Sequence, residues 1–145
     1  MSTPALSDTL HRLTHAYKQR LRIGIRNAGI DLPITHVRAL KGIARNPEAT
    51  AGSIAARMQR DKAQITRVLK ELEEGGLITR QAHPADRRSQ LLRPSRKGDI
   101  LIAKLQAVEQ EAIDTMTRQL KPGELQRFIA LANLMADSVT PSEGD

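Results

Sequence analysis

Apolar side chains recur every three or four residues through most of the chain, which is the spacing of one face of an amphipathic helix. The first stripe predicts a long helix over about residues 4–28. A second, shorter stripe ends before Pro47, because a residue that precedes proline is disfavoured in the helical conformation. Two more stripes follow Ser95, and they predict a long helix that is broken near Pro122 and one last helix after it.

The middle of the chain has shorter elements. Thr50 can cap a helix over "AGSIAARM" (51–58), and Asp61 can cap a helix over "KAQITRVLKELEE". Two short helices joined by a tight turn form a helix-turn-helix. The runs "LITRQ" (77–81) and "SQLLR" (89–93) have strand-like composition and predict a β-hairpin. This order of elements is typical of a winged helix, so we predict a mainly α fold with a small β-hairpin wing.

The positive charge of the chain is concentrated in the residues that precede the last two predicted helices. The chain of 145 residues carries 23 Lys and Arg against 16 Asp and Glu, a formal net charge of +7. Residues 50–99 hold eleven basic and six acidic residues, whereas residues 100–145 hold four and seven. This distribution predicts a polyanion-binding surface joined to a segment with another role. No apolar run approaches the ~20 residues that cross a bilayer and no signal-peptide pattern is visible, so we expect a cytoplasmic protein with no membrane partner.

The second helix of the pair has the chemistry needed to read double-stranded DNA. A helix in the major groove needs donors near its N-terminus, where Gln pairs with adenine and Arg with guanine. Phosphate contacts come from side chains farther along and from the start of the preceding helix. The predicted DNA-contacting residues are Lys62, Gln64, Thr66, Arg67 and Lys70 in this recognition helix, Asp86, Arg87 and Arg88 in the wing, and Thr50, Ser53 and Arg60 at the DNA backbone.

The tip of the predicted hairpin carries two adjacent arginines. Such a tip can reach the minor groove beside the recognition helix, where the negative potential attracts an inserted arginine. We predict that Arg88 inserts. Arg87 is expected to pair with phosphate or with Asp86, whose carboxylate would hold an arginine side chain in one rotamer.

Four features of residues 53–98 occur together in one family of proteins. They are the Asp61-Lys62 opening of the recognition helix, the Thr66-Arg67 step, the exit "LEEGGLITR" and the wing sequence with Pro84 and Asp86-Arg87-Arg88. In these features the chain resembles the MarR-type transcriptional regulators. The resemblance implies a winged helix-turn-helix core whose N- and C-terminal helices form a dimerisation bundle. It also implies a homodimer, usually a repressor, on an inverted-repeat operator, with recognition helices about 34–36 Å apart.

Two positions depart from the pattern of that family. Pro94-Ser95 stands where Leu-Thr is usual, which predicts that the second strand ends early while the helix cap is retained. Arg60 replaces a commonly apolar residue and adds a candidate phosphate contact.

We expect one MarR-like domain over residues 1–145. Its DNA-binding lobe is expected at about 35–97, and its dimerisation helices at about 4–28 and 98–140. The long apolar stripes at both ends of the chain favour dimerisation, and the alternative is that they pack only within one chain.

Many members of this family respond to phenolic or other aromatic anions in the cleft between the dimer helices and the DNA-binding lobe. The resemblance therefore implies that a small anionic or aromatic effector releases the protein from DNA. The candidate effector-binding residues are Tyr17, Lys18, Arg22, His36 and Arg38. The chain has no cysteine, which excludes a thiol-oxidation switch, and we expect no cofactor.

Other interpretations compete with this one. A sequence-tolerant architectural DNA-binding protein would need only the basic surface. An enzyme would need a catalytic constellation, and we predict none because the chain has no nucleophile elbow, phosphate loop or HExxH motif. A protein-interaction bundle would leave Arg87 and Arg88 without a role. His11 and His15 have an i,i+4 spacing that can bind metal, with His36 joining them across a dimer, but such histidines are usually surface residues and we predict no metal site.

Overall fold

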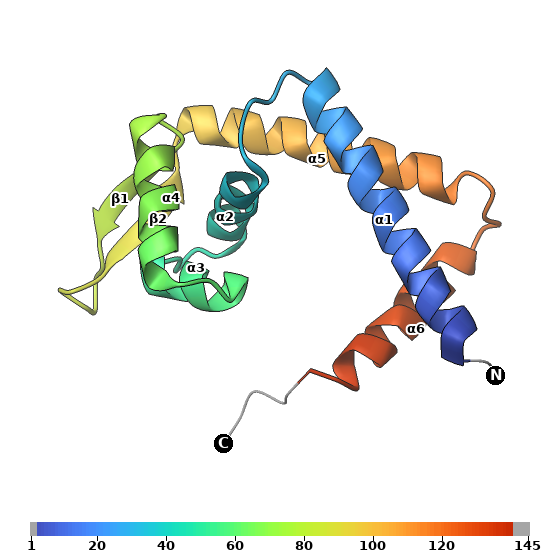
Figure 1. Ribbon diagram of the computed structural model, residues 1–145. Coiled ribbons are helices and arrows are strands. Elements are labelled where there is room, and N and C mark those ends of the chain that lie inside the picture. The colour runs from blue at the N-terminus through green and yellow to red at the C-terminus, as the bar shows by residue number, and fades with distance from the viewer. Residues whose placement is uncertain (1–2, 141–145) are drawn as a thin grey trace.

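The computed structural model describes residues 3–140, which form six helices and one two-stranded antiparallel sheet. In chain order the elements are α1 (Thr3–Asn27), α2 (Ile34–Arg45), α3 (Ala51–Met58), α4 (Lys62–Glu74), β1 (Ile78–Ala82), β2 (Gln90–Pro94), α5 (Arg96–Thr117) and α6 (Glu124–Asp137). The predicted fold class, mainly α with a hairpin after a helix pair, is confirmed. Figure 1 shows α2, α3, α4 and the hairpin gathered into a lobe at one end of α5, while α1 crosses α5 and α6 lies away from the lobe. None of the helices in residues 3–140 combines the length and hydropathy that crossing a membrane requires.

The hydrophobic core lies inside this lobe. Its largest fully buried side chains are Leu40, Ile43, Ile54, Ile65, Leu69, Leu72 and Leu92. Every element of the lobe except β1 supplies at least one of them, and β1 adds the buried Ile78. Burial of one such side chain contributes about 1.5–3 kcal/mol, so the lobe is a firm support for the outer face of α4. The Leu92 N–H also donates to the Ala49 carbonyl at 2.8 Å, which ties the hairpin to the residues before α3.

The predicted helix caps are present. The Thr50 hydroxyl accepts from the Ser53 N–H at 3.1 Å while the Ser53 hydroxyl oxygen accepts from the Thr50 N–H at 2.9 Å, which makes a capping box. The Asp61 carboxylate accepts from a backbone N–H two residues on, at 3.4 Å. The Ser95 hydroxyl accepts from the Gly98 N–H at 3.0 Å. Because these side chains satisfy N–H groups that the helices leave unpaired, α3, α4 and α5 begin where the sequence predicts.

The strands of the hairpin begin one residue later than predicted, and the predicted early end of the second strand is wrong. Pro94 still belongs to β2 and pairs with Ile78 of β1. Just beyond this pair, the Ser95 N–H donates to the Leu77 carbonyl at 2.9 Å. Hydrogen-bonded and non-hydrogen-bonded pairs alternate along an antiparallel ladder, so Pro94 stands in a non-hydrogen-bonded pair, where its missing N–H is not needed.

Two glycines allow helices to approach their neighbours closely. A Cβ on Gly24 of α1 would lie 2.6 Å from Val108 Cγ1 of α5, where the two helices cross. A Cβ on Gly98 would lie only 2.1 Å from the Leu77 carbonyl oxygen, where α5 starts beside the hairpin. The close contact between Gly98 and Leu77 therefore sets the direction in which α5 leaves the lobe.

The apolar faces near the two ends of the chain are left uncovered. No residue of α6 is buried, although the sequence predicts an apolar stripe along it. The end of α5 also differs from the prediction, because the helix stops at Thr117 rather than near Pro122, and Leu120 beyond it is 44% exposed. The exposed large apolar residues of these helices include Leu6, Leu10 and Leu13 on α1 and Phe128, Ile129, Leu131, Leu134 and Met135 on α6.

Candidate nucleic-acid interface

Helix α4 separates its apolar and polar residues onto two faces. Ile65, Val68, Leu69 and Leu72 are buried in the lobe. The five residues predicted to contact DNA are all exposed: Lys62, Gln64, Thr66, Arg67 and Lys70. The structure therefore places the predicted contacts on the side of α4 that faces away from the lobe.

Two of these side chains make local interactions that leave them able to bind. The Thr66 hydroxyl donates to the Lys62 carbonyl at 2.8 Å, so its oxygen keeps its capacity to accept. Arg67 Nε lies 3.8 Å from Glu71 Oε1, and the Arg67 side chain is 84% exposed. Such an exposed i,i+4 pair contributes at most a few tenths of a kcal/mol, so it does not hold the guanidinium back from a DNA base.

The wing tip is held by hydrogen bonds to its own backbone. Asp86 Oδ1 accepts from the Arg88 N–H at 2.9 Å, and Asp86 Oδ2 accepts from the Ser89 hydroxyl at 3.0 Å. These hydrogen bonds, first that of the Arg88 backbone and then that of Ser89, lower the pKa of Asp86 below its usual value. His83 Nδ1 accepts from the N–H groups of Ala85 and Asp86, both at 3.0 Å.

This geometry corrects one expectation about Asp86. In residues 3–140 its carboxylate forms no ion pair with Arg87 or Arg88, and its two oxygens accept hydrogen bonds within the turn instead. Asp86 therefore shapes the backbone that carries the arginines, whose side chains are exposed. The sequence reasoning missed the bracing role of His83, for which its place just before the proline turn was the available signal.

The residues predicted at the DNA backbone are divided between two places. Thr50 and Ser53 stand at the N-terminus of α3, where their hydroxyls already cap the helix. Arg60 is exposed and lines a cavity between the lobe and the long helices. Two other arginines of the hairpin serve the fold, because Arg80 binds Glu73 at 2.5 Å and Arg93 donates to the Pro47 carbonyl.

The cavity that Arg60 lines has a volume of about 520 Å³ and lies between α1, α2 and α5. Four of the five predicted effector-binding residues line it: Tyr17, Lys18, Arg22 and Arg38. His36, the fifth, does not line it and instead makes a 2.5 Å contact from Nε2 to Glu71 Oε2 of α4. Apolar side chains such as Leu21 and Leu105 complete the wall, so the cavity combines an apolar body with cationic groups.

Lys41 and Glu109, which sequence reasoning did not single out, form an ion pair at the wall of this cavity. They lie 68 residues apart in the chain, so no local pattern could have paired them. Burial raises the pKa of Tyr17, the negative charge of Glu109 raises it further, and Arg45 opposes both effects. In residues 3–140 the pair of Lys41 and Glu109 is the one ion pair that joins α2 of the lobe to α5.

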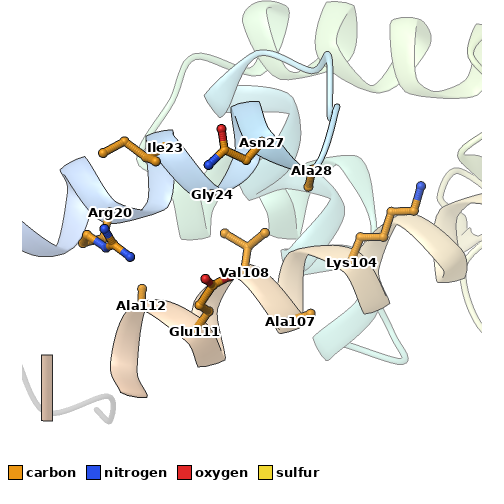
Figure 2. A pocket seen from close by; sticks show the side chains of 10 residues that line it. All are labelled: Arg20, Ile23, Gly24, Asn27, Ala28, Lys104, Ala107, Val108, Glu111 and Ala112. Atoms are coloured by element: carbon orange, nitrogen blue, oxygen red, sulfur yellow. The ribbon is translucent and has the colours of Figure 1, made fainter. Parts of the chain in front are cut away.

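A further cavity of about 430 Å³ lies where α1 and α5 cross. Figure 2 shows side chains from both helices around it, among them Arg20 and Asn27 of α1 and Lys104 and Glu111 of α5. Val108 lines both this cavity and the larger one, so the packing of Val108 against Gly24 separates the two spaces.

Comparison with known proteins shows which family the chain is similar to. The sequence model of the MarR family matches residues 32–90, and a putative transcriptional regulatory protein for the hcr operon of Thauera aromatica is 30% identical over 105 residues. A crystal structure of MarR is 26% identical and has a TM-score of 0.69, with 92% of this chain and 96% of that one covered. Residues 32–90 thus match the MarR family, and the fold of the chain is similar to that of MarR. The alignment with the Thauera protein covers 71% of this chain and 63% of that protein's length.

The segment that matches the MarR family model runs from just before α2 into the start of β2, and so contains the helix pair and the wing tip. The long helices α1, α5 and α6 lie outside it. The structural match reaches them, because an S. aureus MepR mutant bound to an oligodeoxyribonucleotide aligns over 93% of this chain and 98% of its own, at 21% identity and a TM-score of 0.65. That likeness establishes the shared fold of lobe and long helices.

Proposed function

We propose that this chain is a homodimeric, sequence-specific DNA-binding regulator that represses transcription from an inverted-repeat operator in double-stranded DNA, and that a small anionic effector releases it. The observation that carries the proposal is the exposed polar face of α4 beside a braced, arginine-bearing wing. The MepR structure with bound oligonucleotide supports the same use of the same fold. Family and fold point to a DNA-binding regulator rather than an enzyme.

The interface divides the work of recognition between two elements. Gln64 and Arg67 project from the first half of α4, where a helix that enters the major groove contacts base edges. Arg88 is held on the wing by its own N–H bond to Asp86, so its side chain enters the minor groove with little loss of backbone entropy. Thr50 at the start of α3 lies beside a positive helix end that suits a phosphate.

Dimerisation follows from the uncovered apolar faces. Leu134 of α6 is 65% exposed and Phe128 is 50% exposed, while Leu10 of α1 is 47% exposed. Contiguous apolar surfaces of this kind mark contacts with another protein, and a second copy of the chain carries matching faces. To contact two successive major grooves, a two-fold dimer must hold its two α4 helices about 34–36 Å apart.

The effector is proposed to bind in the cavity of about 520 Å³ between the lobe and the long helices. Its apolar walls suit an aromatic or aliphatic body, and Arg22, Arg38 and Lys41 suit an anionic group. An anion that enters competes with Glu109 for Lys41 and weakens the link between α2 and α5. The lobe then changes its position relative to the dimer helices, the spacing of the two α4 helices no longer fits the operator, and DNA affinity falls.

A footprint tests this proposal. The protein first selects a duplex from a random library, and hydroxyl-radical cleavage then maps the protected bases. We expect two protected segments related by inverted symmetry, with centres about 10 bp apart, and two chains per duplex. Uniform protection along the duplex would favour the sequence-tolerant architectural alternative, and a single protected segment with one bound chain would contradict the dimer. Run-off transcription from a promoter that contains the site should fall, whereas a rise would identify an activator.

A further inference from the structure

A smaller cavity, distinct from the effector cavity, lies between α2 and α3. Its volume is about 210 Å³, and none of the residues of α4 or of the wing lines it. Its floor consists of the buried residues Gly42, Ile54 and Met58. Gly42 leaves this space open, since a Cβ there would lie 3.2 Å from Ile54 Cδ1.

The polar part of this cavity is entirely cationic. Arg38, Lys41, Arg45 and Arg57 line it, and no carboxylate does. Of these four, only Lys41 has an ion pair within residues 3–140, and its partner Glu109 lies outside this cavity. Four positive charges around one small space repel one another, and an anion between them removes that cost. Guanidinium groups also present paired donors that match the oxygens of phosphate.

We propose that this cavity binds a small phosphate-type polyanion. At about 30 Å³ per molecule of liquid water, the space holds roughly seven waters, which suits a phosphate or pyrophosphate group and is too small for a drug-sized aromatic ligand. The cavity shares Arg38 and Lys41 with the larger one, so its occupant draws Lys41 away from Glu109. The site thereby acts on the same link between α2 and α5, although its existence does not depend on the proposed effector.

Phosphate groups reach a basic surface from two sources, a free small molecule or the DNA backbone, and the experiment separates them. Inorganic pyrophosphate is titrated into the DNA-free, ¹⁵N-labelled protein at constant ionic strength in chloride. The amide signals of Gly42 and Met58, on the floor of the cavity, report binding. The variant R57Q removes one exposed cation of the cavity, and R26Q removes an exposed cation of α1 that lies outside it. Thermal melting confirms that both variants are folded.

We expect saturable shifts at Gly42 and Met58, a pyrophosphate affinity at least fivefold lower in R57Q, and less than a twofold change in R26Q. R57Q should bind the selected duplex as the wild type does when pyrophosphate is absent. Non-saturable shifts, or equal weakening by both variants, would overturn the proposal because they indicate screening without a site. Weaker duplex binding by R57Q with unchanged pyrophosphate binding would place Arg57 against DNA instead. A protein with no DNA preference would refute the regulator and leave the pyrophosphate result standing.

Discussion

Replacement of Arg88 by alanine isolates the contribution of the wing to DNA binding. The Arg88 side chain is exposed and forms no ion pair within residues 3–140, while its backbone N–H remains bonded to Asp86. The substitution therefore changes the free energy of unfolding by less than about 0.5 kcal/mol. A groove-inserted arginine contributes about 1–3 kcal/mol, and a dimer places two of them on the operator. The dimer should thus lose about 2–6 kcal/mol, a factor of roughly 30 to 20,000 in affinity.

Fluorescence anisotropy with the selected duplex at near-physiological salt measures this loss. R26A is the matched control, because Arg26 is exposed near the end of α1 and away from the wing, and we expect its affinity to stay within twofold of the wild type. Thermal melting of both variants shows that the lobe is intact. If the stable R88A variant bound the duplex within twofold of the wild type, the wing would have no part in recognition.

Four further predictions follow from the packing and the titratable groups. G98A forces a Cβ against a backbone carbonyl oxygen at 2.1 Å, so we expect the free energy of unfolding to fall by about 3 kcal/mol. The thermal midpoint in a melting curve should then fall by about 10 °C. A change below 2 °C would show that the start of α5 can move to make room for the methyl group. L134E introduces a charge on the uncovered face of α6 and should give a monomer in sedimentation equilibrium, whereas an intact dimer would place the interface elsewhere. Tyr17 is the one tyrosine in a chain without tryptophan, so its ionisation can be followed by absorbance. E109Q should lower the pKa of Tyr17, while burial keeps that pKa above the usual value. An unchanged pKa would show that Glu109 does not act on Tyr17. Because the pKa of Asp86 is lowered in the folded wing, the stabilisation that its carboxylate gives to the turn is complete above pH 3.8, the usual pKa, and is lost as the pH falls through the lower pKa of the folded state. An NMR titration of this carboxyl group with a midpoint at or above 3.8 would refute this.

The sequence was sufficient for the elements because their signals are local. Thr50, Asp61 and Ser95 each satisfy backbone N–H groups within three residues, so cap and helix start can be recognised together. The alternation of buried and exposed positions along α4 has the same local origin. Pro94 was misjudged because its tolerance depends on the partner strand, which decides whether its position in the ladder needs an N–H.

The candidate site was less accessible from the sequence wherever distant segments meet. Tyr17 and Arg38 could be proposed from charge and residue type, but the ion pair between Lys41 and Glu109 arises only when α5 packs beside α2. His36 illustrates the opposite error, because residue type alone put it with the effector-binding residues while the turn of α2 directs it to Glu71 of α4. Asp86 was expected to hold an arginine side chain, yet its carboxylate accepts hydrogen bonds from the Arg88 N–H and the Ser89 hydroxyl of its own turn.

The central claim is that the α4 face and the wing make this chain a sequence-specific DNA-binding protein. The most direct test is the ratio of its affinities for the selected duplex and for a scrambled duplex of equal length, measured by fluorescence anisotropy across several salt concentrations. We expect a preference of about 10³-fold or more that persists near physiological salt. Equal affinities for the two duplexes, falling together and steeply as salt rises, would contradict it, because binding would then rest on charge alone.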